Sequence, residues 1–205
     1  MKITRQYLLR GTPSLLLPLG AGFVMASSAD IRAALGMGAA VVVSMLLSSI
    51  VISAIRKIIP QRAKIPAYLL IITGFVSLIQ MVMEAICPGV VNMLGAHLAA
   101  LAVSAVPYRD AEEVADHSGE GKTIRVSLFT GLFFTITMVI CALIREILGN
   151  ATLWGKPIAF LADYKVSALA GAFGAYLVLA FVLAAIRKIG NKMNLIVEID
   201  EKEEE

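Results

Sequence analysis

The sequence has little charge and almost no cysteine. Of its 205 residues only 16% are Asp, Glu, Lys or Arg, against about 25% in a soluble globular chain. The two cysteines, Cys87 and Cys141, are too few for a disulfide scaffold and lack the spacing of a metal site. The basic N-terminus is not followed by a small-x-small cleavage site and a soluble domain, so we do not expect a cleaved signal peptide.

Long apolar stretches take the place of charge. The chain is 59% hydrophobic, with a mean hydropathy of +0.83. Several uncharged runs approach or exceed the roughly 20 residues that a helix needs to cross a bilayer; they cover 33–55, 65–83, 85–108, 126–144 and 166–186. With a short apolar stretch added at the start, the sequence predicts an all-α polytopic membrane protein of six transmembrane segments, at about 12–27, 34–55, 65–86, 91–107, 126–148 and 166–186.

Basic residues are distributed unevenly over the connections between these segments. Of 18 Lys and Arg residues, only Arg32, Arg145, Lys156 and Lys165 fall on one side, which leaves 14 on the other. The positive-inside rule therefore predicts that the basic side and both termini face the cytoplasm. Residues 108–125 are the longest predicted cytoplasmic connection. Residues 188–205 end in "VEIDEKEEE" and are expected to form an acidic, solvated cytoplasmic tail.

The two halves of the chain share short stretches of sequence. "LGAGFVMASSA" at 19–29 is similar to "LGAHLAALAVSA" at 94–105, and "VISAIRKIIP" at 51–60 is similar to "VICALIREILG" at 139–149. We therefore predict a single membrane domain over 1–205, built from a repeat of about 12–86 and a repeat of about 91–187. Because each repeat has three segments, the second copy enters the membrane from the opposite face, which makes a 3+3 inverted repeat.

Segments 1 and 4 contain helix breakers at corresponding places. These are Pro18, Gly20 and Gly22 in the first, and Gly95 and Pro107 in the second. In inverted repeats such discontinuous helices meet near the middle of the membrane, so we predict that segments 1 and 4 are broken half-helices. The alternative is that the glycines only allow neighbouring helices to pack closely.

Several stretches resemble a known family. "SSIVISAIRKIIPQRAKIPAYLLIITGFVSLIQMVMEA" (48–85), "MLGAHLAAL" (93–101), "YRDAEEVA" (108–115) and "ALIREILGNATLWG" (142–155) resemble the RnfE/NqrD subunit of Rnf and Na⁺-translocating NADH:quinone oxidoreductase complexes. The similarity covers roughly 15–185, and "IREILGN-x-TL" favours this subunit over its sister RnfA/NqrE. The resemblance implies a non-catalytic or electron-relay subunit of an ion-translocating electron-transport complex, in the bacterial cytoplasmic (inner) membrane.

The resemblance also implies partners and a cofactor. The chain would pair with an RnfA/NqrE-like sister, beside flavin-bearing and NADH- or ferredoxin-handling subunits. In the family each sister supplies two cysteines to a [2Fe–2S] cluster, consistent with the thiolate ligands of such clusters. The matching positions here are Gly20 or Gly22, and Ser104. We therefore expect a cluster only through the sister subunit, with Cys87 and Cys141 acting as free thiols rather than as a metal site.

Four ionisable residues within or near the membrane segments are further candidates, because charge there is costly and often functional. Glu84 either reaches water at the outer surface or serves an ion path or a subunit contact. His97 is expected to be a hydrogen-bonded packing histidine, with a proton or cofactor role as the alternative. Arg145 and Glu146 are adjacent and point to different helix faces; we expect Arg145 to extend outward and both to contact a neighbouring subunit.

A second function stays open. An inverted repeat with broken helices is also typical of transporters, and a fold does not determine a function. A divergent paralogue without redox chemistry could act as a small-molecule or ion transporter, or as a membrane anchor for another reductase. The cysteines of the sister subunit distinguish the two hypotheses.

Overall fold

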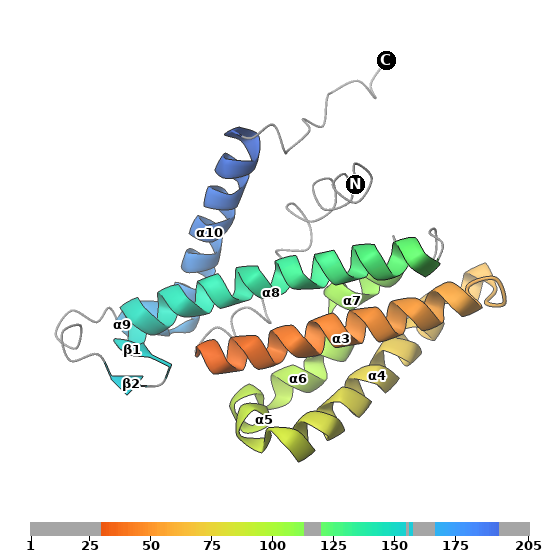
Figure 1. The fold of residues 1–205 in the computed structure, drawn as a ribbon, viewed down its shortest axis with the longest axis horizontal. Coiled ribbons are helices and arrows are strands. Elements are labelled where there is room, and N and C mark those ends of the chain that lie inside the picture. Colours follow the sequence, from red (N-terminus) through yellow and green to blue (C-terminus); the bar gives the residue numbers. More distant parts are fainter. Residues whose placement is uncertain (1–29, 113–119, 155, 158–166, 193–205) are drawn as a thin grey trace.

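The computed structural model describes residues 30–112, 120–154, 156–157 and 167–192, and element labels follow Figure 1. The described chain is helical apart from one antiparallel hairpin of two-residue strands. Its elements in order are α3 (Ile31–Ile55), η1 (Gln61–Ala63), α4 (Lys64–Ile86), α5 (Pro88–Leu94), α6 (Ala96–Ala100), η2 (Leu101–Val103), α7 (Ala105–Asp110), α8 (Glu120–Asn150), β1 (Thr152–Leu153), β2 (Lys156–Pro157), α9 (Ser167–Ala170) and α10 (Ala172–Lys192).

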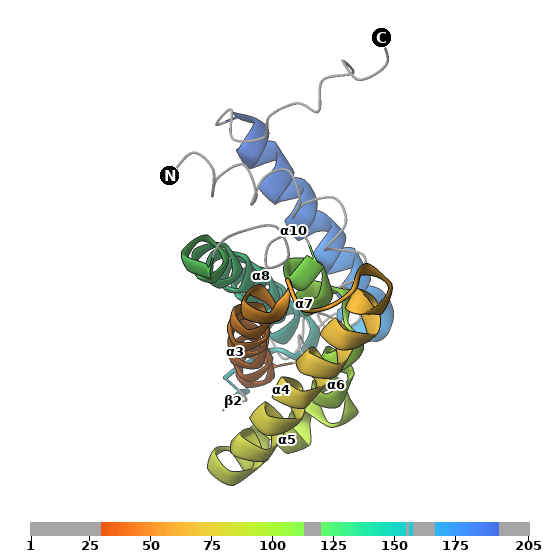
Figure 2. The same ribbon diagram turned by 90° about the vertical axis from the view of Figure 1, so that its right-hand side faces the viewer.

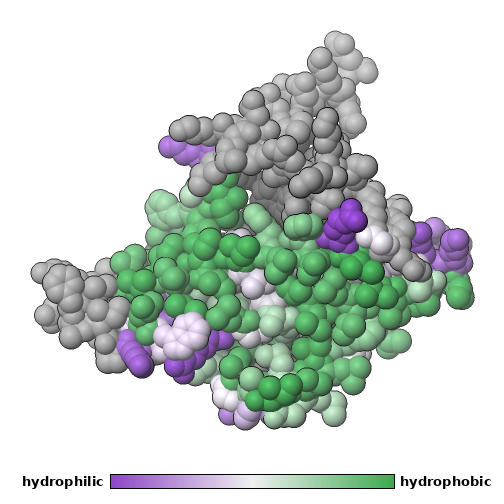
Figure 3. All heavy atoms as spheres, viewed as in Figure 1, coloured by the Kyte–Doolittle hydropathy of each residue, from purple (hydrophilic) through white to green (hydrophobic). Residues whose placement is uncertain are grey.

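Three expected membrane segments are single helices. Segments 34–55, 65–86 and 126–148 lie within α3, α4 and α8, each long and apolar enough to cross a membrane. A bent pair of helices makes a fourth candidate span. In Figure 3 hydrophobic side chains cover the sides of these helices, and hydrophilic residues gather near the helix ends. The all-α membrane class is thus confirmed. The expected first segment, 12–27, lies outside the described residues.

Helices α3 and α8 pack antiparallel, with α4 crossing on the other side of α3 (Figures 1 and 2). Small residues allow the close approach of α3 and α8. A Cβ atom at Gly38 would overlap the Thr135 side chain, and one at Gly131 would lie 3.1 Å from Val42 Cγ2. The Thr135 hydroxyl lies 2.8 Å from the Gly131 carbonyl oxygen of its own helix and 3.2 Å from that of Gly38. Between membrane helices such close packing is a principal source of stability.

The fourth segment is broken at Gly95, as the sequence predicts, whereas the other expected breaker, Pro107, lies inside α7 and does not interrupt it. The helices before and after Gly95 meet at 73°, and Gly95 has φ +53° and ψ −135°, a conformation that only glycine adopts readily. A second interruption falls at Ser104, whose extended backbone (φ −74°, ψ 148°) separates η2 from α7. The expected connection 108–125 is partly helical, because α7 continues to Asp110 and α8 begins at Glu120.

The sixth segment differs from the uninterrupted helix expected over 166–186. The short helix α9 ends at Ala170, and α10 starts two residues later. The turn needs small residues, because a Cβ atom at Gly174 would overlap the backbone of Leu169. Beyond the turn, α10 runs away from α3 and α4 (Figure 1). A count of apolar residues does not reveal such a turn, since Gly171 and Gly174 are themselves uncharged.

Replacing Gly38 with alanine should destabilise the protein, whereas the same change at Gly74 should not. Gly38 touches Thr135 on α8, while Gly74 lies on α4 with nothing within 4 Å of its added methyl group. Overpacking typically costs about 1–3 kcal/mol, and glycine to alanine in an open helix position gains about 0.5–1 kcal/mol. Thermal unfolding of the two variants in detergent measures both changes in stability. Equal unfolding midpoints for the two variants would contradict the close contact of α3 and α8.

Candidate functional site

A buried carboxylate from α8 closes the first turn of α3. Glu146 is fully buried, and its Oε2 accepts a hydrogen bond of 2.9 Å from the backbone N–H of Ile31. The N-cap residue Asp30 makes no side-chain hydrogen bond of its own to this turn. The first N–H groups of a helix need acceptors and carry partial positive charge, so a carboxylate satisfies both requirements. Glu146 therefore joins residues 115 positions apart in the sequence.

The neighbouring Arg145 binds the end of another helix. It is 4% exposed, and its guanidinium donates to the carbonyl oxygens of Leu169 (3.2 Å), Ala170 (2.8 Å) and Gly171 (3.4 Å). The Leu169 and Ala170 carbonyls belong to the end of α9, where a helix leaves such groups without intrahelical donors. The Gly171 carbonyl follows in the turn before α10 and also accepts the backbone N–H of Ala175. The expectation that Arg145 extends outward is wrong. The predicted divergence of Arg145 and Glu146 is confirmed, because they reach α9 and α3 respectively; their contact with another subunit stays a prediction.

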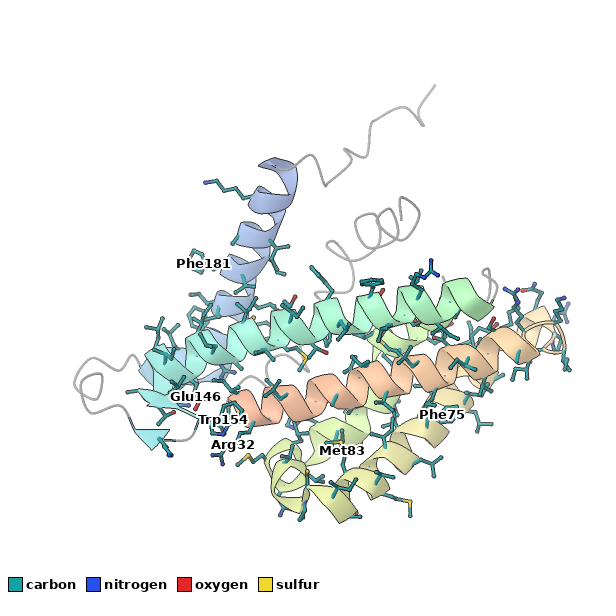
Figure 4. All side chains as sticks on the ribbon, in the orientation of Figure 1. Arg32, Phe75, Met83, Glu146, Trp154 and Phe181 are labelled. Carbon is teal, nitrogen blue, oxygen red and sulfur yellow. The ribbon has the colours of Figure 1, made fainter. Side chains whose placement is uncertain are left out.

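An exposed pair lies at the same end of the α3–α8 pair. Arg32 Nη2 donates to the Trp154 carbonyl oxygen at 3.0 Å, and its guanidinium carbon lies 5.8 Å from the centre of the indole ring. Trp154 sits in the β1–β2 turn with φ +58°. Figure 4 shows Arg32, Glu146 and Trp154 together beside the start of α3. This end of the molecule thus has a buried carboxylate near an exposed cation and aromatic ring.

Ser104 is buried at the second break of the fourth segment. It is 5% exposed, and its hydroxyl oxygen has no hydrogen-bond partner among the described residues. A buried hydroxyl in that state costs about 1–3 kcal/mol. The other predicted ligand positions, Gly20 and Gly22, lie outside the described residues.

The two cysteines occupy different surroundings. Cys87 is exposed between α4 and α5, where it lines an apolar groove with Val82 and Met83, and Cys141 is fully buried in α8. Across the described ranges, no three His, Cys, Asp or Glu side chains gather as metal ligands.

The remaining two candidates lie at the surface of the chain. Glu84 is exposed near the end of α4, and its expected access to water stays a prediction. His97 is also exposed, with Nδ1 3.0 Å from the Leu94 carbonyl oxygen. Its expected hydrogen bond is present, but the side chain is not packed inside this chain. Ion-path and subunit-contact roles for both residues stay predictions.

A buried carboxylate that sequence reasoning missed lies at the opposite end of the α3–α8 pair from Glu146. Asp110, the last residue of α7, is 5% exposed. Its Oδ2 accepts hydrogen bonds from the hydroxyls of Ser49 on α3, at 2.6 Å, and Ser127 on α8, at 2.5 Å. Three separate elements therefore supply oxygen atoms to one buried point.

Comparison with known proteins identifies the family of this chain. The profile described as "Rnf-Nqr subunit, membrane protein" matches residues 1–186. The chain belongs to the Rnf–Nqr subunit family. It is 30% identical over 186 residues to the E-type subunit of the Na(+)-translocating ferredoxin:NAD(+) oxidoreductase complex of Acetobacterium woodii, covering 91% of this chain and 95% of that one.

Two further members of the Rnf–Nqr family are similar to this chain over a smaller share of their length. The E-type subunit of the ion-translocating oxidoreductase complex of Shewanella amazonensis is 30% identical, over 81% of this chain and 72% of that one. The corresponding subunit of Rhodobacter capsulatus is 35% identical over 60% of this chain and 50% of its own length. The resemblance to the RnfE-type subunit is thereby confirmed.

Glu146→Gln should loosen the start of α3 in this Rnf–Nqr subunit. The amide oxygen can still accept a hydrogen bond, but the charge that favours the helix N-terminus is lost. We expect a loss of about 1–2 kcal/mol in the free energy of unfolding. Amide hydrogen exchange should rise in peptides from the first turns of α3.

Glu84→Gln is the matched control, because Glu84 is an exposed carboxylate on α4. It should leave exchange at α3 unchanged. Unaltered exchange in Glu146→Gln, or an equal rise in both variants, would contradict the capping role.

Proposed function

We propose that this chain is an integral membrane subunit of an Rnf/Nqr-type ion-translocating electron-transport complex, in the place of the RnfE-type subunit. The observation that carries the proposal is the length of the match to the Acetobacterium woodii protein. It covers nearly all of both chains, so the two correspond as whole membrane domains rather than through one shared segment. The buried polar contacts of α8 with α3 and α9 support a defined tertiary structure around this domain.

The arrangement of α3 and α8 supports the proposed inverted repeat. The stretch 51–60 covers the end of α3 and the five residues that follow it, and the similar stretch 139–149 covers the C-terminal part of α8. Because these helices are antiparallel, the two stretches lie at opposite ends of the pair (Figure 1). A twofold axis in the membrane plane relates elements in this way. We therefore propose six segments, three in each copy, with the first in the position equivalent to the broken fourth.

The positions of charges support a cytoplasmic location for one end of this pair. Arg56 and Lys57 follow α3, and Arg125 lies near the start of α8, at the same end of the pair (Figure 1). Arg32 and Lys156 belong to the opposite end. The positive-inside rule then favours both termini on the cytoplasmic side of a bacterial inner membrane.

We propose further that the chain pairs with an RnfA/NqrE-like sister without ligating a [2Fe–2S] cluster itself. The chemistry of Ser104 supports this step, because a neutral hydroxyl replaces the thiolate that such a cluster requires. Cys87 and Cys141 belong to other elements, one exposed and one within α8. In this arrangement the chain contributes scaffold and ion-path walls, and flavins belong to partner subunits.

The second candidate function is a non-redox transporter or an anchor for another reductase. The buried hydroxyl of Ser104 in a broken membrane helix favours it, since such breaks line the binding sites of transporters. It replaces the first proposal if the sister also lacks its cysteines.

Affinity purification of the tagged full chain from its native membranes tests the proposal. We expect an RnfA/NqrE-like protein and flavin-bearing subunits to co-purify in constant ratio, because a subunit buries its interface permanently in the complex. A tagged polytopic membrane protein from the same cells serves as the control. Purification of the chain alone, or with no redox subunit, would overturn the assignment.

A further inference from the structure

Asp110, Ser49 and Ser127 form a cluster of oxygen atoms that packing alone does not require. The contacts come from α7, α3 and α8, with both hydroxyls donating to Asp110 Oδ2 at 2.6 and 2.5 Å. Both serines are fully buried, and Asp110 is 5% exposed. A buried carboxylate is costly in an apolar environment, and in membrane segments such groups typically mark ion pathways.

Two other buried hydroxyls of the same helices bond within their own helix. Ser44 on α3 donates to the Val41 carbonyl oxygen at 2.9 Å, and Thr137 on α8 donates to that of Phe133, also at 2.9 Å. These bonds satisfy the hydroxyl within its own helix, as serine and threonine commonly do in apolar helices. Ser49 and Ser127 instead turn toward a shared carboxylate on a third element.

The site lies a short way inside one end of the α3–α8 pair. Ser49 precedes the end of α3 by six residues, and Ser127 follows the start of α8 by seven. At 1.5 Å per residue each is roughly 10 Å from its helix end. Two more buried hydroxyl residues, Ser53 and Thr123, occur between the site and that end. Polar side chains therefore extend from the basic end of the pair to Asp110.

We propose that Asp110, Ser49 and Ser127 bind a desolvated Na⁺ ion. Hard cations take oxygen ligands, and these residues supply a carboxylate and two hydroxyls from three elements. Each serine oxygen carries two lone pairs, so it can coordinate a cation while donating its proton to Oδ2.

The broken fourth segment adds to the chemistry of the site. Asp110 ends α7, the helix that follows the interruption at Ser104, and Ala111–Glu112 continue it in a π-helical turn. In membrane transporters, interrupted helices of this kind form the binding sites for coupling ions. The inference deepens the proposed function, on which it rests, by naming an ion site in this subunit.

Binding of radioactive ²²Na⁺ to the purified full chain in detergent tests the inference directly. We expect saturable binding of about one ion per chain, and a rise of several degrees in the unfolding midpoint when NaCl replaces choline chloride at constant ionic strength. Asp110→Asn should abolish both effects, and Ser49→Ala or Ser127→Ala should weaken binding about tenfold or more. KCl should produce a smaller shift than NaCl.

Ser44→Ala and Thr137→Ala are the matched controls, because each removes a buried hydroxyl from α3 or α8 without touching Asp110. They should leave Na⁺ affinity unchanged. If Asp110→Asn does not fold, the Na⁺ affinities of Ser49→Ala and Ser44→Ala still test the site, because Ser49 donates to Asp110 whereas Ser44 donates within its own helix. No saturable binding by the wild type, an equal response to Na⁺ and choline, or equal loss in test and control variants would overturn the inference.

The two proposals can fail separately. A chain that co-purifies with redox subunits but binds no Na⁺ retains the proposed function and loses the ion site. If the chain binds Na⁺ through Asp110 yet purifies without redox subunits, the ion site is supported and membership of the complex is contradicted.

Discussion

The close antiparallel contact between α3 and α8 is the interaction on which the described structure depends. Lipid tails are as apolar as leucine, so hydrophobic burial does little to hold membrane helices together, and stability comes from close packing and polar contacts. Gly38 and Gly131 allow the close packing, because they let the two backbones approach. Asp110 and Glu146 make the polar contacts, near opposite ends of the pair.

The polar contacts also position the elements around this pair. Arg145 and Glu146 are consecutive residues, and their divergent side chains fix the start of α3 and the end of α9 to the same turn of α8. At the other end Asp110 attaches α7 to both long helices. Hydrogen bonds of this kind are strong where the local dielectric is low, and the loss of one partner is correspondingly costly. The broken fourth and sixth segments are thus held by buried polar groups rather than by their own helical continuity.

The long helices were predictable because crossing a bilayer imposes a required length of uncharged sequence. The break at Gly95 was predictable as well, since the glycine occurs inside an apolar run with a counterpart in the other half. The partners of Arg145 and Glu146 were not, because Ile31 lies 115 positions away in the sequence. A charge near a helix end is expected to reach water, and only tertiary structure shows that Arg145 meets backbone carbonyls instead.

Asp110 escaped prediction for a related reason. The stretch 108–125 contains many charges and is typical of a solvated connection, yet α7 carries its Asp110 between α3 and α8. The expectation of a ligand position at Ser104 comes from the resemblance to the family and not from geometry. The structure adds that this hydroxyl is buried and that the described thiols belong to other elements. The described structure thus has a broken helix with a buried hydroxyl at the position where the resemblance implies a ligand.

The most direct test of this account is iron content and low-temperature EPR of this chain purified with its native partners and reduced with dithionite. The account predicts that any [2Fe–2S] signal from the membrane layer is lost when the sister's cysteines are changed and is unaffected by Cys87→Ser with Cys141→Ser. A signal lost with Cys87→Ser or Cys141→Ser would contradict it, because this chain would then ligate the cluster itself.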